Sequence, residues 1–306
     1  MKIAVYNLRN LFGPGTYKVY DEQVVYSSEF VQQRVNHAVR IISKLGADVI
    51  IVNEIGSSEI LATIAQQLSG DYLSHMANPG PRGIGNGVIY KVPEAVCESV
   101  PVVSTLPVFH TGDQEAYAGQ LRFQRDLVHL TTTYASQPLH VFGLHFKSSL
   151  PTPLKDSAGK EVTPNIQVEA GDGLARSAIR RLGEARALRT MIDNVFSHDK
   201  NAQVIIAGDF NDTERSAVVR MVQGESESLL GRLTNLCGLA PEDRRYTVQS
   251  EDGHKQLIDH ILVSQSLLAK VIGIEIDNKN LHNEEEKFKP TEFIESDHAP
   301  IVVEFK

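Results

Sequence analysis

Tryptophan is absent from this chain of 306 residues, and cysteine occurs only twice, at Cys97 and Cys237. The two cysteines lie far apart and match no metal-binding spacing, so we expect ordinary, partly buried thiols and no disulfide scaffold. The lack of tryptophan, together with the lack of an apolar, aromatic-rich helix, argues against docking on a membrane surface.

Long apolar runs are also missing. No stretch approaches the ~20 apolar residues that cross a bilayer, which argues against a membrane span. The N-terminal segment Met1–Tyr6 has no apolar signal region and leads directly into a strand pattern. We therefore expect a soluble protein, either cytoplasmic or secreted with its leader removed. A hydrophobic fraction of 42% can fill a core, which excludes a disordered chain.

Basic residues are fewer than acidic ones. The chain has 30 Lys and Arg and 38 Asp and Glu, which gives a net charge of -8. This balance argues against a protein that coats nucleic acid through bulk electrostatics. It does not exclude an enzyme that meets phosphate at a local metal site. Part of the acidity is concentrated in one expected loop, at Glu284–Glu286.

Short runs rich in valine and isoleucine alternate with helical patterns along the chain. The predicted strands are Lys2–Leu8, Asp48–Ile55, Asn86–Lys91, Leu127–Tyr134, Leu139–Phe146, Gln203–Phe210, Ile258–Ser264 and Ile301–Phe305. The predicted helices are Ser28–Leu45, Ser58–Leu68, Ala175–Phe196 and Arg215–Val222. Runs such as Val49–Val52 are apolar at every position, which indicates sheets covered on both faces. The segment Ser148–Gly173 is irregular and predicts a long loop beside a site.

Polar groups stand where several apolar strands end, at Asn7, Asn53, Glu54, His145, Lys147, Asp209 and Asn211. Asp297 and His298 come just before the last strand, and Asp259 stands amid apolar residues within Leu257–Ile261. Each one alone is compatible with a cap or a turn. Together they favour a ligand site, because open α/β sheets bind ligands at strand ends. Carboxylate and amide oxygens suit Mg²⁺ or Mn²⁺, whereas the histidines are too dispersed for a zinc motif.

These residues stand in blocks that resemble the endonuclease/exonuclease/phosphatase superfamily, which includes pancreatic-type deoxyribonucleases, apurinic/apyrimidinic endonucleases and neutral sphingomyelinases. The blocks are Val5–Leu8, Ile51–Ile55, Gly143–Lys147, Ala207–Asp212, Leu257–Ser264 and Ser296–Pro300. His145–Ser148 and Arg245–Thr247 look most like bacterial members. The resemblance implies an α/β (α+β) fold, a four-layer αββα sandwich with two face-to-face mixed β-sheets. It also implies a single domain over residues 1–306.

The resemblance further implies a divalent cation, Mg²⁺ or Mn²⁺. Asn7 and Glu54 would hold it, with Glu54 as the main protein ligand. Asp297 would lie near the metal or near a second metal position. Many relatives have glutamine where this chain has Asn53, which leaves the role of that neighbour open. No equivalent is found for the tyrosine that some abasic-site enzymes place near the phosphate.

Catalytic roles are implied for five residues. Asp209 and Asn211 would lie beside the phosphate and align the attacking water. His298 would be hydrogen-bonded to Asp259. His145 would donate to a phosphate oxygen or assist the leaving group. The resemblance does not decide whether Asp209 or His298 deprotonates the water.

The substrate is less defined than the reaction. The predicted helix Ala175–Phe196 carries Arg176 and Arg180, Lys147 follows His145, and the preceding loop carries Lys155 and Lys160. These cations could bind a polyanionic backbone, or they could form a solvated helix face.

We favour a metal-dependent nuclease that cuts DNA or RNA. The alternative is a phosphatase or phosphodiesterase for a small or lipid-linked phosphate ester, of inositol phosphate or sphingomyelin type. A binding module with a decayed site is a third hypothesis, which the full set of expected groups disfavours. No obligate protein partner is implied.

Overall fold

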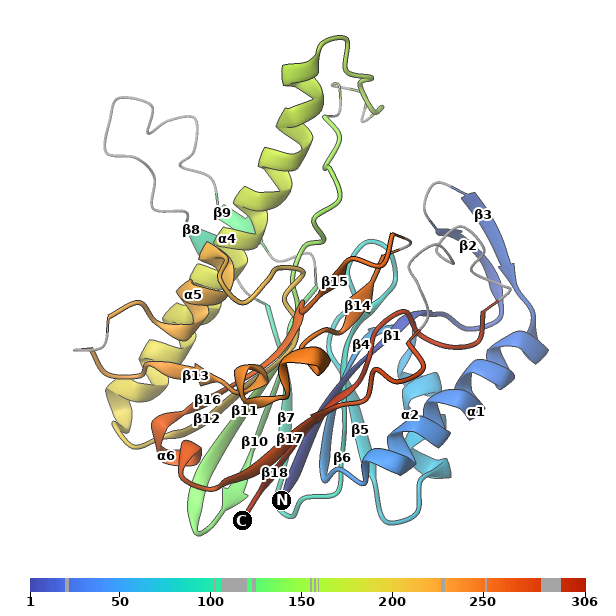
Figure 1. Ribbon diagram of the computed structural model, residues 1–306. Coiled ribbons are helices and arrows are strands. Elements are labelled where there is room, and N and C mark those ends of the chain that lie inside the picture. Colours follow the sequence, from blue (N-terminus) through green and yellow to red (C-terminus); the bar gives the residue numbers. More distant parts are fainter. Residues whose placement is uncertain are drawn as a thin grey trace.

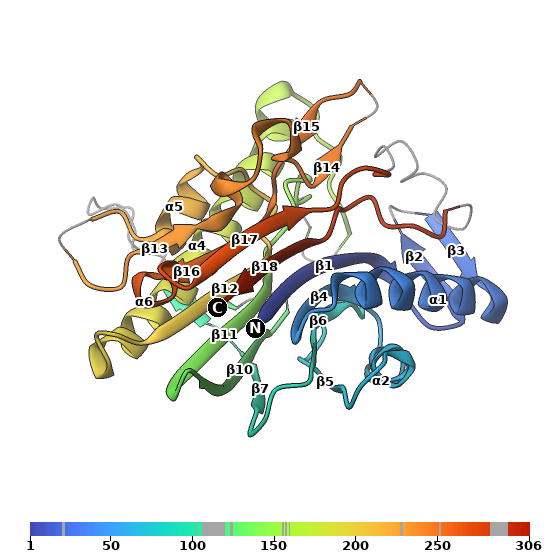
Figure 2. The same cartoon turned by 60° about the horizontal axis from the view of Figure 1, so that its bottom comes forward.

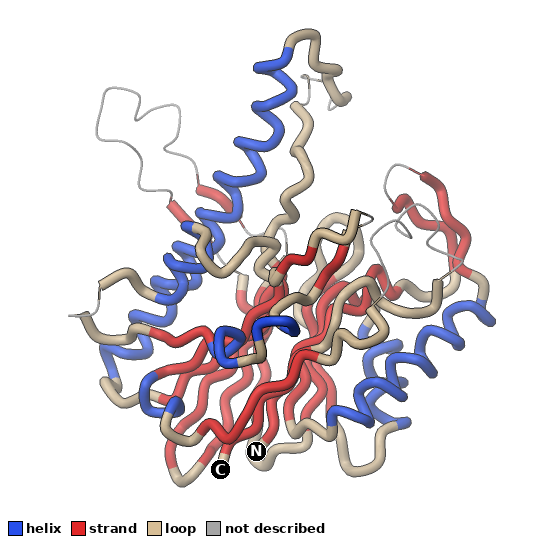
Figure 3. The backbone as a smooth tube through the Cα atoms, viewed as in Figure 1, coloured by secondary structure: helices blue, strands red, loops and turns tan. Residues whose placement is uncertain are grey.

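Figure 1 shows the computed structural model as a ribbon, and Figure 3 shows the same view coloured by secondary structure. The structure describes residues 1–19, 22–101, 103–105, 120–122, 125–154, 156, 158, 160–226, 229–250, 252–281 and 293–306. Lys155 and the acidic run Glu284–Glu286 lie outside these residues.

Two six-stranded sheets form the centre of the fold. The first contains, in spatial order, β17 (Val271–Ile276), β18 (Ile301–Phe305), β1 (Lys2–Leu11), β4 (Val49–Ile55), β6 (Gly85–Tyr90) and β5 (Leu73–Met76). The second contains β13 (Leu233–Asn235), β16 (Asp259–Ser264), β12 (Gln203–Asp209), β11 (Gln137–His145), β10 (Leu127–Tyr134) and β7 (Val96–Val100). Both sheets are mixed, since β1 pairs with β4 and β11 pairs with β12 in parallel while the other pairs are antiparallel.

Helices cover the outer face of each sheet, as Figures 1 and 2 show. The helices α1 (Ser28–Leu45) and α2 (Ser58–Gln67) lie on the first sheet, and α4 (Gln167–His198) and α5 (Ala217–Gln223) lie on the second. Shorter elements are β2 (Gly15–Val19), β3 (Glu22–Tyr26), β8 (Val103–Thr105), β9 (Gln120–Arg122), β14 (Val248–Gln249), β15 (Lys255–Gln256), α6 (Gln265–Leu268) and the 3₁₀ turns η1 (Leu236–Leu239) and η2 (Glu242–Arg244). The predicted fold class, with two mixed sheets and helices outside, is confirmed.

Three apolar layers hold the sandwich together, and β4 shows why its sequence is apolar throughout. Successive side chains of a strand point to opposite faces. Ile51 therefore lies between the sheets, against Val141 and Ile205, whereas Ile50 lies under α1 and α2. A third layer packs the second sheet against Leu188 and other residues of α4 and α5. Burying both faces of the strands supplies most of the apolar area that stabilises such a fold.

The helix α1 has the predicted bounds because both of its ends are capped. The Ser27 side chain accepts from the Phe30 N–H, and Gly46 adopts the left-handed conformation with φ of 59°. The bounds of α4 were predicted wrongly. This helix begins at Gln167 instead of Ala175, so the last seven residues of the predicted loop Ser148–Gly173 are helical.

The first turns of α4 lack an apolar face, which explains why periodicity missed them. Residues 167–172 are exposed, and Figure 1 shows this end of the helix rising beyond the sheets. The segment after β11 lies against it, since the Thr152 N–H donates to the Gly173 carbonyl at 2.9 Å. A Cβ on Gly173 would lie 2.9 Å from Pro151 Cβ, so the close approach requires glycine.

The two ends of the described chain meet at the edge of the first sheet, where the Met1 amino group donates to the Phe305 carbonyl at 3.0 Å. The ends of β11 and β12, which carry His145 and Asp209, lie at the opposite edge together with Asn7, the residue of β1 after which the β1–β4 register shifts. No described helix is long and apolar enough to cross a bilayer.

Candidate active site

A cavity of about 350 Å³ opens at this opposite edge, over the junction of the two sheets. Its lining includes Arg9, Glu54, Arg82, Arg125, His145, Asp209, Asn211, Asp297 and His298. Asn7 and Asp259 lie behind this lining and are hydrogen-bonded to residues in it. The structure thus gathers polar residues from five strands (β1, β4, β11, β12 and β16) and from the segment before β18 at one place.

Irregular backbone places the Glu54 carboxylate. The β1–β4 ladder shifts register after Asn7, and the β4–β6 ladder shifts between Val52 and Ile55. Glu54 itself has a positive φ of 59°. Bulges of this kind re-aim a side chain, and a non-glycine residue at positive φ costs about 1–3 kcal/mol unless its surroundings hold it. The Asn10 N–H provides such a hold, since it donates to Glu54 Oε2 at 2.8 Å.

Arg34 holds the backbone of residues 8–10, which precede and contact Glu54. The sequence patterns did not predict this role. Arg34 lies on α1 with 4% of its surface exposed. Its guanidinium donates to the carbonyls of Leu8 at 2.6 Å and Arg9 at 2.8 Å. Arg9 and Asn10 both have positive φ, so Arg34 secures the strained turn that holds Glu54.

Replacing Arg34 by methionine is expected to lower the free energy of unfolding by about 2–4 kcal/mol, because buried carbonyls lose their donors. The concentration of Mn²⁺ that gives half-maximal activity should rise about 10–100-fold, because Glu54 loses its support. Denaturant unfolding and Mn²⁺ titrations of activity measure the two effects. Arg40→Met on the exposed face of α1 is the control, and a destabilised Arg34 variant with unchanged Mn²⁺ dependence would make Arg34 a purely structural residue.

Asp209 lies at the centre of the cluster. Its Oδ2 atom accepts from Asn7 Nδ2 at 3.1 Å and lies 3.6 Å from His145 Nε2 and 4.0 Å from His298 Nε2. Its Oδ1 atom accepts from the Asn211 N–H at 2.7 Å. Burial, followed by the charge of Asp259, raises the pKa of Asp209 to about 7. The Asp209 carboxylate therefore gains and loses its proton close to neutral pH.

Asp259 and His298 form a buried pair. Asp259 Oδ2 lies 2.8 Å from His298 Nδ1, which fixes the ring with Nε2 toward Asp209. Burial opposes the charged imidazole, but the charge and hydrogen bond of Asp259 outweigh it, so the pKa of His298 lies well above its usual value. The neighbouring His260 points to the other face, where it contacts Asn235 and the Asp212 carbonyl. The arrangement is an oriented histidine–carboxylate pair.

His145 faces the same cavity from the end of β11. Its Nε2 atom lies 3.8 Å from Glu54 Oε1, and the Arg125 guanidinium donates to its carbonyl at 3.2 Å. Burial, followed by the charge of Arg125, lowers the pKa of His145 well below its usual value. His145 is therefore neutral near pH 7 and can donate one hydrogen bond without carrying charge.

Asn53, at the position where many relatives have glutamine, lies between the sheets and not in the cavity. Its Nδ2 donates to Asn86 Oδ1 at 2.9 Å and to the Leu144 carbonyl at 2.8 Å. Its Oδ1 accepts from the Asp209 N–H at 3.1 Å. Asn53 thus fastens β4 to β11 and β12 beneath the site, a structural role.

Asp297 is held differently from the other acids. It lies 3.7 Å from Arg9 Nε, and both side chains are buried. Ser296 fastens this segment to β1, because its Oγ donates to the Asn7 carbonyl at 2.7 Å. The pairing with Arg9 leaves Asp297 less available to a metal than Glu54.

The donor set fits a divalent cation. Ligand atoms of Asp209, Asp259 and His298 all lie within 4.8 Å of one another, and Glu54 lies across the cavity. Asp259 Oδ1 is buried without a hydrogen-bond partner. Carboxylate oxygens and the Asn7 amide are ligands that Mg²⁺ and Mn²⁺ prefer, and a cation would offset this concentration of negative charge.

The predicted substrate-binding cations have different surroundings. Lys147, Arg176 and Arg180 line a second cavity, which adjoins the first. Arg181 is instead largely buried and pairs with Asp212, with Arg181 Nε 3.2 Å from Asp212 Oδ2. On α4, Arg176 and Arg180 therefore face the second cavity, whereas Arg181 forms a structural ion pair.

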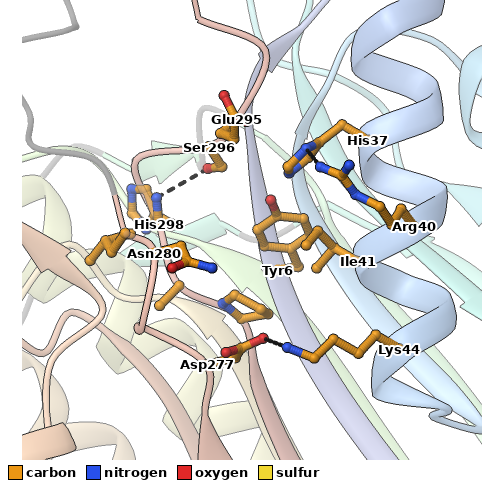
Figure 4. A pocket seen from close by; sticks show the side chains of 13 residues that line it. Tyr6, His37, Arg40, Ile41, Lys44, Asp277, Asn280, Glu295, Ser296 and His298 are labelled. Carbon is orange, nitrogen blue, oxygen red and sulfur yellow. Dashed lines mark hydrogen bonds and ion pairs between the residues drawn. The ribbon is translucent and has the colours of Figure 1, made fainter.

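A further cavity, which Figure 4 shows, lies on the other side of His298. His37, Arg40 and Lys44 of α1 line it; Arg40 contacts His37, and Lys44 is paired with Asp277. None of Glu54, Asp209 or Asp259 lines it. The reactive groups therefore belong to the cavity at the strand ends.

Comparisons with known proteins identify the family and the fold. A family model described as "Endonuclease/Exonuclease/phosphatase family" matches residues 6–298. Humanized D. rerio TDP2 is similar in structure, with a TM-score of 0.59, 15% identity, and coverage of 100% of this chain and 98% of that chain. The Bacteroides thetaiotaomicron VPI-5482 mannosyl-6-phosphatase Bt3783 has a TM-score of 0.58, 16% identity, and coverage of 100% and 99%.

A protein from Leptotrichia buccalis C-1013-b, described as belonging to the endonuclease/exonuclease/phosphatase family, has a TM-score of 0.54, 18% identity, and coverage of 100% and 99%. No curated protein matched the sequence. At these identities the likenesses establish the fold and leave the substrate open.

Proposed function

The chain belongs to the endonuclease/exonuclease/phosphatase family, and from this premise we propose that it hydrolyses phosphodiester bonds of nucleic acid with the help of a divalent cation. One observation carries the proposal. A single buried carboxylate oxygen, Asp209 Oδ2, lies within 4.0 Å of Asn7, His145 and His298 side-chain nitrogens at the wall of one cavity. Such convergence is what phosphoryl transfer requires.

In the proposed mechanism, Glu54 and Asn7 hold the cation, with Asp297 nearby. The bound cation supplies positive charge that offsets the repulsion between phosphate and nucleophile. Asp209, oriented by Asn211, aligns the attacking water. Asp209 and His298 both face this point. Because the pKa of His298 lies well above its usual value, its ring holds a proton near pH 7, and Asp209 is the group that can accept the proton of the water.

His145 acts on the phosphate oxygens or the leaving group, in contrast to Asp209, which aligns the water. Its neutral ring can donate from Nε2 to a phosphate oxygen or to the leaving group, without attracting a counter-charge. Arg9 and Arg82 line the cavity beside it. Fixed donors of this kind stabilise charge that develops on the phosphate oxygens in the transition state.

Nucleic acid is favoured as the substrate by the cations of α4 and the adjoining loop, because a strand carries phosphates on both sides of the bond that is cut. The second candidate is a small phosphate ester. The mannosyl-6-phosphatase shares the fold to the same degree as TDP2, so fold likeness does not separate the two substrates.

Wild-type protein is expected to hydrolyse plasmid DNA, single-stranded DNA or RNA when Mg²⁺ or Mn²⁺ is supplied, and to lose this activity when EDTA removes the cation. The panel should also contain inositol phosphates, sphingomyelin and mannose 6-phosphate. Hydrolysis of only these small esters would reject the nuclease proposal, and turnover that survives complete chelation would reject the metal.

A further inference from the structure

A second cavity, of about 610 Å³, continues the catalytic cavity toward α4. The two share Arg82, Arg125 and Ser148 in their linings, so a ligand can extend from one into the other. The outer wall comes from the segment Pro151–Leu154, which lies along α4.

Positive charge dominates its lining, which contrasts with the net charge of the chain. The basic lining residues are Arg82, Arg125, Lys147, Arg176 and Arg180. Among the described residues, Glu161 is the one acidic residue of the lining. A chain with a net charge of -8 thus concentrates cations at one edge of its candidate active site.

These five basic side chains also form no ion pair with a carboxylate in the described part of the chain. Other arginines of α4 do form such pairs. Arg181 lies 3.2 Å from Asp212, and Arg189 lies 2.6 Å from Asp193. Near this wall, Glu184 of the same helix accepts from the Lys147 backbone N–H at 2.7 Å and not from the ammonium group.

The cations are held in place by neutral groups. Arg176 Nε donates to the Thr152 carbonyl at 2.9 Å, which leaves its terminal nitrogens for a ligand. Lys147 Nζ donates to oxygen atoms of Ser148 and Leu150 at 3.0–3.1 Å. Burial, followed by the charges of Arg181 and Arg125, lowers the pKa of Lys147 to about 8. An anion in the cavity would relieve this repulsion between neighbouring cations.

We propose that this second cavity is a subsite for a second phosphate group of the substrate, next to the phosphate that reacts. Guanidinium groups bind phosphate oxygens in a bidentate manner, and pre-ordered ones lose little entropy on binding. The inference rests on the proposed hydrolysis and narrows its substrate to esters with at least two phosphates. A nucleic acid strand and a small bisphosphate share this chemistry.

The kinetic test compares substrates that differ by one phosphate. The dinucleotide TpT is compared with pTpT and TpTp, and an inositol monophosphate with an inositol bisphosphate. The extra phosphate should raise kcat/KM about tenfold or more in wild-type protein. Arg176→Gln with Arg180→Gln should remove most of this ratio, whereas Arg220→Gln, an exposed arginine of α5, should keep it. The dinucleotide and inositol arms identify the source of the phosphate.

A binding test separates this inference from the proposed function. Labelled dT₆ is titrated in EDTA, where no hydrolysis is expected, and its fluorescence anisotropy is followed. The double variant should bind about tenfold or more weakly, and its slope of log affinity against log salt should be shallower by about 1.4, for two lost phosphate contacts.

The outcomes divide clearly. Weaker dT₆ binding by the variant supports the subsite even if the wild-type protein hydrolyses none of the substrates, in which case the proposed function alone fails. Hydrolysis with the same phosphate ratio in wild type and variant, and with equal dT₆ affinity, overturns the subsite and leaves the hydrolase intact.

Discussion

Replacing Glu54 by glutamine is expected to lower the rate of metal-dependent phosphodiester hydrolysis by about 10³-fold or more, with little change in stability. The two side chains have the same shape, and the amide oxygen of glutamine can still accept from the Asn10 N–H that now binds Glu54 Oε2 at 2.8 Å. What disappears is the negative charge beside the cavity. A neutral amide is a much weaker ligand for Mg²⁺ than a carboxylate.

The expected result has two readouts. Calorimetry with Mn²⁺ should show the affinity falling along with kcat/KM, and the far-ultraviolet circular dichroism spectrum should be unchanged. Glu304→Gln is the matched control, because Glu304 lies on β18 and is paired with Lys2 in a partly exposed ion pair. If Glu54→Gln binds Mn²⁺ as tightly as the wild type, Glu54 is not the principal ligand and the proposed metal site is wrong.

Much of the fold could be predicted because it follows from local patterns. The strand β4 was found from an unbroken apolar run, and α1 from its spacing and its Gly46 cap. The strand β17 was missed because Gly273 interrupts the apolar run and five of its six residues are not buried. The start of α4 was missed because its first residues contact solvent. Elements without a buried face leave no periodic signal.

The candidate site divides in the same way. Asn7, Glu54 and Asp209 could be proposed from the sequence because strand ends in such folds meet at one edge. Arg34 and Arg125 could not, since their function depends on contacts with residues distant in sequence. Arg34 donates to carbonyls that are 25 and 26 residues away in the sequence, and the periodicity of a helix or strand does not predict such a contact.

The structure also explains how the excess of Asp and Glu over Lys and Arg is compatible with a phosphate ligand. Asp209 and Asp259 are buried beside the candidate metal site, where a bound cation would offset their negative charge. The cations are instead gathered without acidic partners along one cavity. Net charge describes the long-range field, whereas a phosphate in the cavity meets the local arrangement. The overall balance of charge therefore does not conflict with phosphate chemistry.

The second large effect is expected from His298→Ala, which should lower kcat by about 10²–10⁴-fold. His298 Nε2 lies 4.0 Å from Asp209 Oδ2, and its Nδ1 is fixed by Asp259 at 2.8 Å. Alanine therefore removes a group that can hold or move a proton beside the attacking water. Asp259→Asn should cause a smaller loss, about 10²-fold, because the ring stays in place but loses the charge that orients it.

The affinity for Mn²⁺ decides whether the fall in kcat of His298→Ala comes from a lost proton-transfer group or from a lost metal ligand. If His298 acts on protons, His298→Ala keeps the wild-type affinity for Mn²⁺ that Glu54→Gln loses, and His254→Ala at an exposed site leaves both rate and affinity unchanged. If His298→Ala instead loses Mn²⁺ as completely as Glu54→Gln, the group formed by Asp209, Asp259 and His298 holds a cation itself. The paired variants thus separate the two roles that this cluster of ligands permits.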